Sequence, residues 1–194
     1  MQSATTTLLA AAMVLATGCA SVPATAEPTK KSGGDKPAAA SHGVNNDDLY
    51  LVYHEHRVYV FDDTPTYLSF LANGETPFTL TRIGGGPKGE TVVFGLSAKD
   101  KKKRSGLGGV DLYDGKITGA DGFYGEIVRD QRVFVFGAWK DMKDFMTAGE
   151  APFTYTDIGA GPKGETLVFV LNKGNKKHKP VQLIETFRAR HSKG

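Results

Sequence analysis

The sequence predicts an α+β fold: two tandem β-β-α-β-β repeats packed as a pseudo-twofold unit with antiparallel sheets, followed by a C-terminal helix. The first observation behind this prediction is an internal duplication. Residues 57–94 align without a gap to residues 132–169 at an offset of 75, and 21 of the 38 aligned positions are identical. The second is the hydrophobic pattern, which in each copy changes from strand-like segments to helical spacing and back. A duplication at a fixed offset indicates two copies of one structural unit.

Each copy is expected to begin with a β-hairpin. Segments 50–53 and 57–61 are rich in Val and Tyr and flank the polar turn His54-Glu55-His56. In the second copy, segments 124–128 and 132–136 flank the equivalent turn, Arg129-Asp130-Gln131.

A helix follows the hairpin in each copy. In the first copy Asp63 or Thr64 is suited to cap it, Pro65 fits its first position and Gly74 fits its end. One helical face is apolar, because large apolar residues recur at three- and four-residue spacing. These residues are Tyr67, Phe70 and Leu71 in the first copy and Met142, Phe145 and Met146 in the second.

Two further strands complete each copy. Segments 78–83 and 153–158 alternate with threonines, which predicts strands exposed on one face or at an edge. Segments 91–96 and 166–171 are apolar nearly throughout, which predicts strands covered on both faces. Because one helix covers only one face, we expect the sister copy to cover the other.

The N-terminal segment predicts export. Residues 8–16 form an apolar run that is too short to span a bilayer and fits a secretory signal peptide. The end of this segment, Ala16-Thr17-Gly18-Cys19, resembles the lipobox of bacterial lipoproteins. That resemblance implies cleavage before Cys19 and acylation of Cys19, for example with palmitate; the alternatives are a signal peptide without lipidation and an unmodified buried cysteine. Cys19 is the single cysteine, so the chain forms no intramolecular disulfide.

The lipoprotein resemblance also implies a location. Ala20 and Ser21 lack the Asp of an inner-membrane retention signal, which favours the outer membrane of a Gram-negative bacterium, on its periplasmic or its surface side. Residues 20–46 are rich in Ala, Pro, Ser, Thr, Gly and Lys, a composition that predicts a flexible tether.

The rest of the chain supplies a linker and a closing helix. Segment 99–109 is charged and then Gly-rich, as a connection should be. Val181, Ile184 and Phe187 form an apolar stripe, which predicts a docked C-terminal helix. The predicted organisation is a signal peptide (1–18), a lipidated tether (19–46), repeat module 1 (47–98), a linker (99–120), repeat module 2 (121–172) and a basic segment with the C-terminal helix (173–194).

A glycine-rich motif recurs in both copies and is a candidate binding loop. Its letters match a dinucleotide fingerprint, but a strand follows it where that fingerprint needs a helix. The pattern therefore favours a wide hairpin loop, with an anion-binding nest as the alternative. The residues concerned are Gly84, Gly86, Lys88, Gly89 and Glu90 in the first copy and Gly159, Gly161, Lys163, Gly164 and Glu165 in the second.

No constellation of residues predicts catalysis or metal binding. His54 and His56 have a spacing that metals tolerate, but the second copy has Arg129 and Gln131 there and no third ligand is evident. No carboxylate pair or activated nucleophile stands out. We therefore expect no enzymatic activity, no metal and no cofactor.

Two basic clusters occupy equivalent positions after the two copies. They are either solvated surface or a patch attracted to anionic lipid, lipopolysaccharide or peptidoglycan. A net charge of +3 and the lack of interleaved aromatic residues argue against nucleic acid as a partner. The clusters are Lys101, Lys102, Lys103 and Arg104 in the first and Lys176, Lys177 and Lys179 in the second.

One further resemblance concerns the core of each copy. Residues 57–61 followed by a helix with Phe70 resemble the YHS-type module, as do residues 132–145. That family includes metal-handling proteins, but its cysteine is absent here, so the resemblance implies no metal role for any residue.

These observations rank three functions. The first is a non-catalytic cell-envelope lipoprotein whose duplicated module binds an envelope component or a partner protein. The second is a periplasmic small-ligand or metal-binding protein with its site between the two repeats. The third is a hydrolase-type enzyme.

Overall fold

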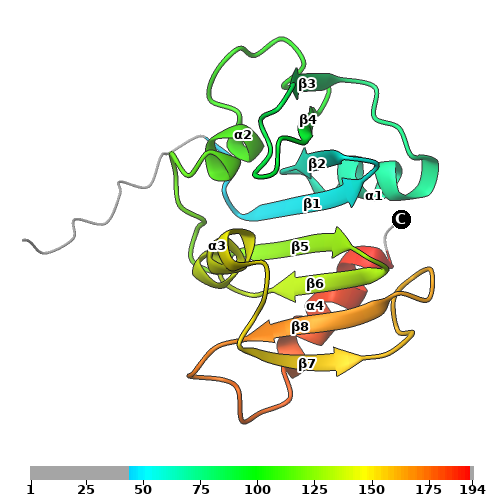
Figure 1. Cartoon of the computed structure of the whole chain (residues 1–194), viewed down its shortest axis with the longest axis vertical. Helices are drawn as coiled ribbons and strands as arrows, with labels where there is room; N and C mark the ends of the chain where they lie inside the picture. The colour runs from blue at the N-terminus through cyan, green and yellow to red at the C-terminus, as the bar shows by residue number, and fades with distance from the viewer. Residues whose placement is uncertain (1–43, 193–194) are drawn as a thin grey trace, which may run out of the picture. The chain divides into compact units, whose positions relative to one another are not determined.

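The computed structural model describes residues 44–192, which form an α+β arrangement (Figure 1). The first copy contains β1 (Asp48–His54), β2 (Arg57–Phe61), α1 (Thr64–Asn73), β3 (Thr79–Arg82) and β4 (Thr91–Gly95). Helix α2 (Gly108–Tyr113) follows it. The second copy contains β5 (Tyr124–Arg129), β6 (Arg132–Phe136), α3 (Trp139–Ala148), β7 (Phe153–Asp157) and β8 (Thr166–Leu171), and α4 (Val181–His191) closes the chain.

All eight strands belong to one mixed sheet in the order β3-β4-β2-β1-β5-β6-β8-β7. The predicted antiparallel sheets are therefore wrong in part, because β2 pairs with β4, β6 with β8 and β1 with β5 in parallel. The prediction missed this because a helix separates the second strand of each copy from its third and fourth. That connection lets the fourth strand return beside the second in the same direction.

The two copies meet edge to edge, so the expectation that one copy covers the face of the other is wrong. Strands β1 and β5 use their free edges to continue the sheet, and helices cover both faces (Figure 1). Helices α1 and α4 pack on one face, here called the α1/α4 face, through Tyr67, Phe70, Ile184 and Phe187. Helices α2 and α3 pack on the other, the α2/α3 face, through Val110, Leu112, Trp139, Met142 and Phe145.

The predicted cap and end of the first helix are confirmed, whereas Pro65 stands at the second helical position, after Thr64, and not at the first. Asp63 caps α1 by accepting a hydrogen bond from the Thr66 amide at 2.9 Å, and Gly74 ends it with φ of 75°. The polar turn is a two-residue turn in which Glu55 and His56 have φ of 47° and 58°, as a type I′ hairpin requires.

The C-terminal helix is also confirmed, with one difference in its packing. Ile184 and Phe187 are buried as predicted, whereas Val181 at the start of α4 is 52% exposed. Helix α2 was not predicted, because Gly108 and Gly109 lie at its start where the sequence suggests a linker. Gly108 is needed there, since a β-carbon would collide with the carbonyl oxygen of Asn45.

Candidate functional site

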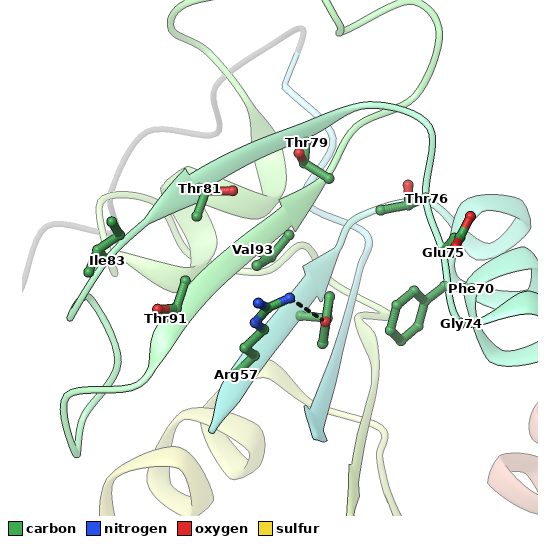
Figure 2. Close-up of a pocket in the computed structure, with 11 residues that line it drawn as sticks. Arg57, Phe70, Gly74, Glu75, Thr76, Thr79, Thr81, Ile83, Thr91 and Val93 are labelled. Carbon is green, nitrogen blue, oxygen red and sulfur yellow. Dashed lines mark hydrogen bonds between the residues drawn. The ribbon is translucent and has the colours of Figure 1, made fainter. Parts of the chain in front are cut away.

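A cleft of about 540 Å³ lies over the outer strands of the first copy, beside the end of α1. Figure 2 shows Thr79, Thr81 and Ile83 following one another near β3, with Thr91 and Val93 on the neighbouring strand. The residues that line this cleft are Arg57, Tyr59, Phe70, Gly74, Glu75, Thr76, Thr79, Thr81, Ile83, Thr91 and Val93.

The second copy has the same cleft, with a volume of about 470 Å³. Each of the eleven residues lining the first cleft has its counterpart, 75 positions later, lining the second. Nine of these eleven pairs are identical, against 12 of the other 27 aligned positions of the repeat. Because β3 and β7 are the two edge strands, the clefts lie at opposite ends of the sheet. They also lie on opposite faces, since Tyr59 packs with the α1/α4 cluster and Phe134 with the α2/α3 cluster.

Helix ends position one charged group at each cleft. Gly74 and Gly149 adopt left-handed conformations, and their amides donate to the carbonyls of Phe70 and Phe145 at 2.7 Å. Glycine takes this conformation without the steric cost that a β-carbon adds. The chain therefore leaves the helix sharply, and the exposed Glu75 and Glu150 that follow line the two clefts.

The cleft surface combines hydroxyl groups with an exposed apolar rim. Ile83 is 91% exposed and its counterpart Ile158 is 85% exposed, and these are the two most exposed large apolar side chains described. In the first cleft the Thr76 hydroxyl is buried and has no hydrogen-bond partner among residues 44–192. A buried hydroxyl without a partner carries a free-energy cost that a bound polar ligand can remove.

The glycine-rich loops join the cleft strands, because Ile83 and Thr91 bracket the first of them. The loop is part of an antiparallel β3–β4 hairpin. The Glu90 carboxylate accepts a hydrogen bond from the Lys88 amide at 2.7 Å. In the second copy Glu165 does the same for the Lys163 amide at 2.7 Å. In each loop the backbone amide that could bind an external anion therefore already donates to a glutamate of the same loop.

The structure separates the two basic clusters. They follow β4 and β8, which lie near opposite ends of the sheet, so they do not form one patch. Lys101 lies 4.7 Å from the Phe78 ring centre and Lys176 lies 4.1 Å from that of Phe153, in cation–π contacts. His54 and His56 are exposed in the hairpin turn, with His54 3.6 Å from Glu55.

A buried polar centre, not predicted from the sequence, lies where β1 meets β5 on the α1/α4 face. Glu126 is fully buried and accepts hydrogen bonds from the hydroxyls of Tyr67 at 2.7 Å and Tyr124 at 2.6 Å. The His191 Nε2 atom lies 3.0 and 3.1 Å from its two oxygens. The signal available in the sequence was Glu126 itself, a charged residue within a strand whose neighbours are apolar.

A second group of polar residues adjoins this centre. The Arg190 Nη1 atom donates to Asp48 at 2.8 Å and to Thr64 at 2.8 Å, and Tyr50 stacks on Tyr67 with ring centres 4.3 Å apart. Burial raises the pKa of Asp48 more than its bond to Arg190 lowers it. One oxygen of Asp48 is buried without a hydrogen-bond partner among the described residues. These contacts fasten the end of α4 to the sheet.

A cavity of about 570 Å³ lies between the two copies on the α2/α3 face. The first copy contributes Tyr53 and the loop residues Gly85, Gly86 and Pro87, and the second contributes residues of α3. Asp114 at its wall is held by Arg82 at 2.6 Å and by Lys116 at 2.8 Å. The cavity therefore offers mainly aromatic and apolar surface together with Lys143 and Thr147.

Cys19 and the predicted tether up to residue 43 lie outside the described residues. Within residues 44–192 no helix is long and apolar enough to cross a membrane, and no group of three or more His, Cys, Asp or Glu side chains is placed to hold a metal ion. Comparison with protein-family models, curated protein sequences and solved structures found no match.

Proposed function

We propose that the chain is a non-catalytic cell-envelope lipoprotein whose duplicated module binds an envelope component through the paired clefts. One observation carries this proposal: the exposed residues of the clefts are the same in both copies. Arg57, Glu75, Thr79, Thr81 and Ile83 are all exposed, and each has an identical, exposed counterpart 75 positions later.

The exposed positions of the two helices provide the comparison. Pro65, Ser69, Ala72 and Asn73 of α1 are exposed, and so are their counterparts in α3, yet none of the four pairs is identical. Exposed residues away from special structural features change with little effect on stability. Since both surfaces have had the same time to diverge, the identity of the cleft residues favours a shared binding role over slow divergence.

We also propose that the two copies are related by a pseudo-twofold axis that runs along the strands. Three features support it: parallel pairing of β1 with β5, strand registers that match at an offset of 75, and placement of α1 and α3 on opposite faces. An axis in this direction turns one face into the other. The clefts therefore face opposite ways, and one molecule can hold two strands of a polymer with the gain in apparent affinity that bivalency provides.

Co-sedimentation with purified peptidoglycan sacculi and with lipopolysaccharide micelles tests the proposed binding. Thr81→Lys and Thr156→Lys each place a long charged side chain in one cleft. We expect each single variant to lower apparent affinity by about 100-fold, because one blocked cleft already removes bivalency, and the double variant, with both clefts blocked, to sediment least. Ser69→Lys with Asp144→Lys, at exposed helix positions, is the matched control. Unchanged sedimentation of the cleft double variant, or no sedimentation of the native chain with either material, contradicts the proposal.

Anchoring through Cys19 is the second part of the proposal and is tested separately. Radiolabelled palmitate should enter the native chain and not Cys19→Ser. Equal labelling of the two chains ends the lipoprotein assignment without affecting the test of the clefts.

A small-ligand role remains the second candidate function, favoured by the cavity between the two copies. Trp139, the single tryptophan of the chain, lines that cavity. A ligand bound there should change its fluorescence, whereas a ligand confined to the clefts should not. A saturable fluorescence change with envelope extract, lost in Lys143→Met, supports this role; no change argues for the clefts.

A further inference from the structure

The two clefts differ in polar groups and charge, and every difference points in the same direction. The first has Tyr59 and Thr76 where the second has Phe134 and Ala151, so the first carries two more hydroxyls. Only the second is lined by an additional arginine, Arg129. We infer that the second cleft recognises an acidic sugar unit of a glycan and the first an uncharged one, an inference that rests on the proposed binding role of the clefts.

Arg129 is held in place for such a role. Its Nη2 atom donates to the carbonyl oxygen of Gly149 at 3.0 Å. Its guanidinium lies 5.8 Å from the ring centre of Phe134 and 5.5 Å from that of Phe145, within the range of cation–π contact. The side chain is 32% exposed, and its ion pair with the exposed Asp130 is long, at 3.5 Å. A pre-positioned arginine loses little side-chain entropy when it binds an anion.

The counterpart of Arg129 in the first copy is His54, which does not line the first cleft. Its side chain is 63% exposed and lies near Glu55. The charged lining of the first cleft is therefore balanced, with Arg57 against Glu75.

Arg132, the other arginine of the second cleft, lacks the hydrogen-bond partner that its counterpart Arg57 has in the first cleft. In the first cleft the Arg57 Nη1 atom donates to the Tyr59 hydroxyl at 3.4 Å, as the dashed line in Figure 2 shows. Phe134 cannot accept such a bond, and among residues 44–192 Arg132 has no side-chain hydrogen bond or ion pair. Two guanidinium groups and one carboxylate, that of Glu150, thus line the second cleft, and Asp130, which pairs with Arg129, is not among the lining residues. Guanidinium groups pair with carboxylate and phosphate through two parallel hydrogen bonds.

The features that both clefts share point to a sugar. Three threonines of each cleft, one on the inner strand and two on the edge strand, supply hydroxyls that both donate and accept hydrogen bonds. Glu75 and Glu150 accept hydrogen bonds from a ligand hydroxyl or amide, and Ile83 and Ile158 offer apolar contact to a sugar ring. A hydroxyl-rich ligand satisfies all these groups at once. The acid can be the carboxylate of a peptidoglycan sugar or the phosphate of a lipopolysaccharide sugar.

Titration of the full chain with matched sugars, followed by nuclear magnetic resonance of the cleft amides, tests this inference. N-acetylmuramic acid against N-acetylglucosamine probes a carboxylate, and glucose 6-phosphate against glucose probes a phosphate. At the second cleft we expect at least one acidic sugar to bind about tenfold more tightly than its neutral partner, an effect of the size of one charge-assisted hydrogen bond. At the first cleft we expect a preference of less than about twofold. The pair that shows the effect identifies the source of the acid.

Two variants exchange residues between the copies, which limits damage to the fold. Arg129→His should remove the preference at the second cleft, and His54→Arg with Tyr59→Phe should create one at the first. Equal binding of acidic and neutral sugars at the second cleft, a preference at the first cleft instead, or no shift with any of the four sugars overturns this inference. If sacculi or lipopolysaccharide still sediment the chain in that case, the proposed binding function stands and only the assignment of charge is wrong.

Discussion

The two faces of the sheet carry opposite chemistry at the β1–β5 junction, although the residues there come from equivalent positions of the repeat. On the α1/α4 face Tyr67, Tyr124 and Glu126 form the buried polar centre. The residues 75 positions away are Met142, Leu49 and Leu51, which are fully buried in the apolar cluster of the α2/α3 face. The same backbone positions therefore support a hydrogen-bonded network on one face and close apolar packing on the other.

The difference follows from the helix that covers each face. On the α2/α3 face Gly125 leaves room for Met142, whose sulfur would lie only 2.4 Å from a β-carbon at Gly125. Helix α2, six residues long, contributes the apolar side chains of Val110 and Leu112 to the cluster on this face. On the α1/α4 face the end of α4 brings Arg190 and His191, which need acceptors when they are buried. The polar centre thus ties the C-terminal helix to both copies, through Tyr67 of the first and Glu126 of the second.

Separation of the two copies should have the largest effect on folding. Residues 47–98 alone lose both the β5 partner of β1 and the cover that α2 gives to Val58, Val60 and Phe94. A module of this size is near the lower limit for an adequate core. We expect the fragment to be unfolded, aggregated or dimeric by circular dichroism and size-exclusion chromatography. A monomer with dispersed amide resonances would show that each copy folds independently.

Removal of the Glu126 carboxylate alone should destabilise the protein more than replacement of Glu126 and both tyrosine hydroxyls by apolar groups. Glu126→Leu introduces the residue of the other face and leaves the hydroxyls of Tyr67 and Tyr124 without acceptors. We expect a loss of about 3 to 5 kcal/mol in the free energy of unfolding, measured with urea. The triple variant Glu126→Leu, Tyr67→Phe, Tyr124→Phe should recover part of that loss, because no orphaned hydroxyl remains. A single variant as stable as the native chain would show the network to be dispensable.

The phenols of the same centre should make the protein sensitive to alkaline pH. Burial, and next the Glu126 carboxylate, raises the pKa of Tyr67 and Tyr124 well above 10.0. In the folded state these phenols keep their protons at a pH where the unfolded chain has lost them. The stability they contribute is therefore full below a pH of about 10 and falls as the pH rises above it.

Urea unfolding at several pH values checks this dependence. Tyr67→Phe should cost about 1 to 3 kcal/mol near neutral pH, through the lost hydrogen bond, and should lower the slope of stability against pH above about 10. Tyr59→Phe removes a phenol that does not contact Glu126 and is the control. The same slope in Tyr67→Phe and the native chain would contradict the assigned role.

The sequence predicts local structure in this chain better than it predicts how the elements pair. Residue types and spacing act over a few residues, and they predict the cap of α1 at Asp63, the end of α1 at Gly74 and the β3 strand that begins at Thr79. The parallel pairing of β1 with β5 depends on residues far apart along the chain, and apolar strands do not indicate whether a helix or a sister copy covers them.

The clefts could be predicted only in part. The nearly identical glycine-rich loops, which differ only at Gly85 and Ala160, are evident from the two copies in the sequence, but Thr79, Thr81 and Ile83 have the pattern of an ordinary edge strand. They become candidate binding residues only when the structure shows that these identical residues are exposed. The polar centre was hidden for a similar reason, since Tyr67 and Glu126 are 59 residues apart.

The smallest predicted effect compares the starts of the two equivalent helices. Asp63 caps α1 with φ of −145° and ψ of 115°, and Ala138 stands at the start of α3 with nearly the same backbone, φ of −151° and ψ of 138°, but has no side-chain oxygen to offer. The first four amides of a helix have no acceptor within the helix. An aspartate at this position satisfies one of them and places negative charge at the positive end of the helix dipole. We expect Ala138→Asp to stabilise the protein by about 1 kcal/mol and Asp63→Ala to destabilise it by about the same amount, both measured by urea unfolding.

The two changes lie in different copies, so the double variant should have nearly the stability of the native chain if the effects add. A stabilising effect of Ala138→Asp well below the cost of Asp63→Ala would show that Trp139, buried at the first position of α3, already holds that helix start in place by packing.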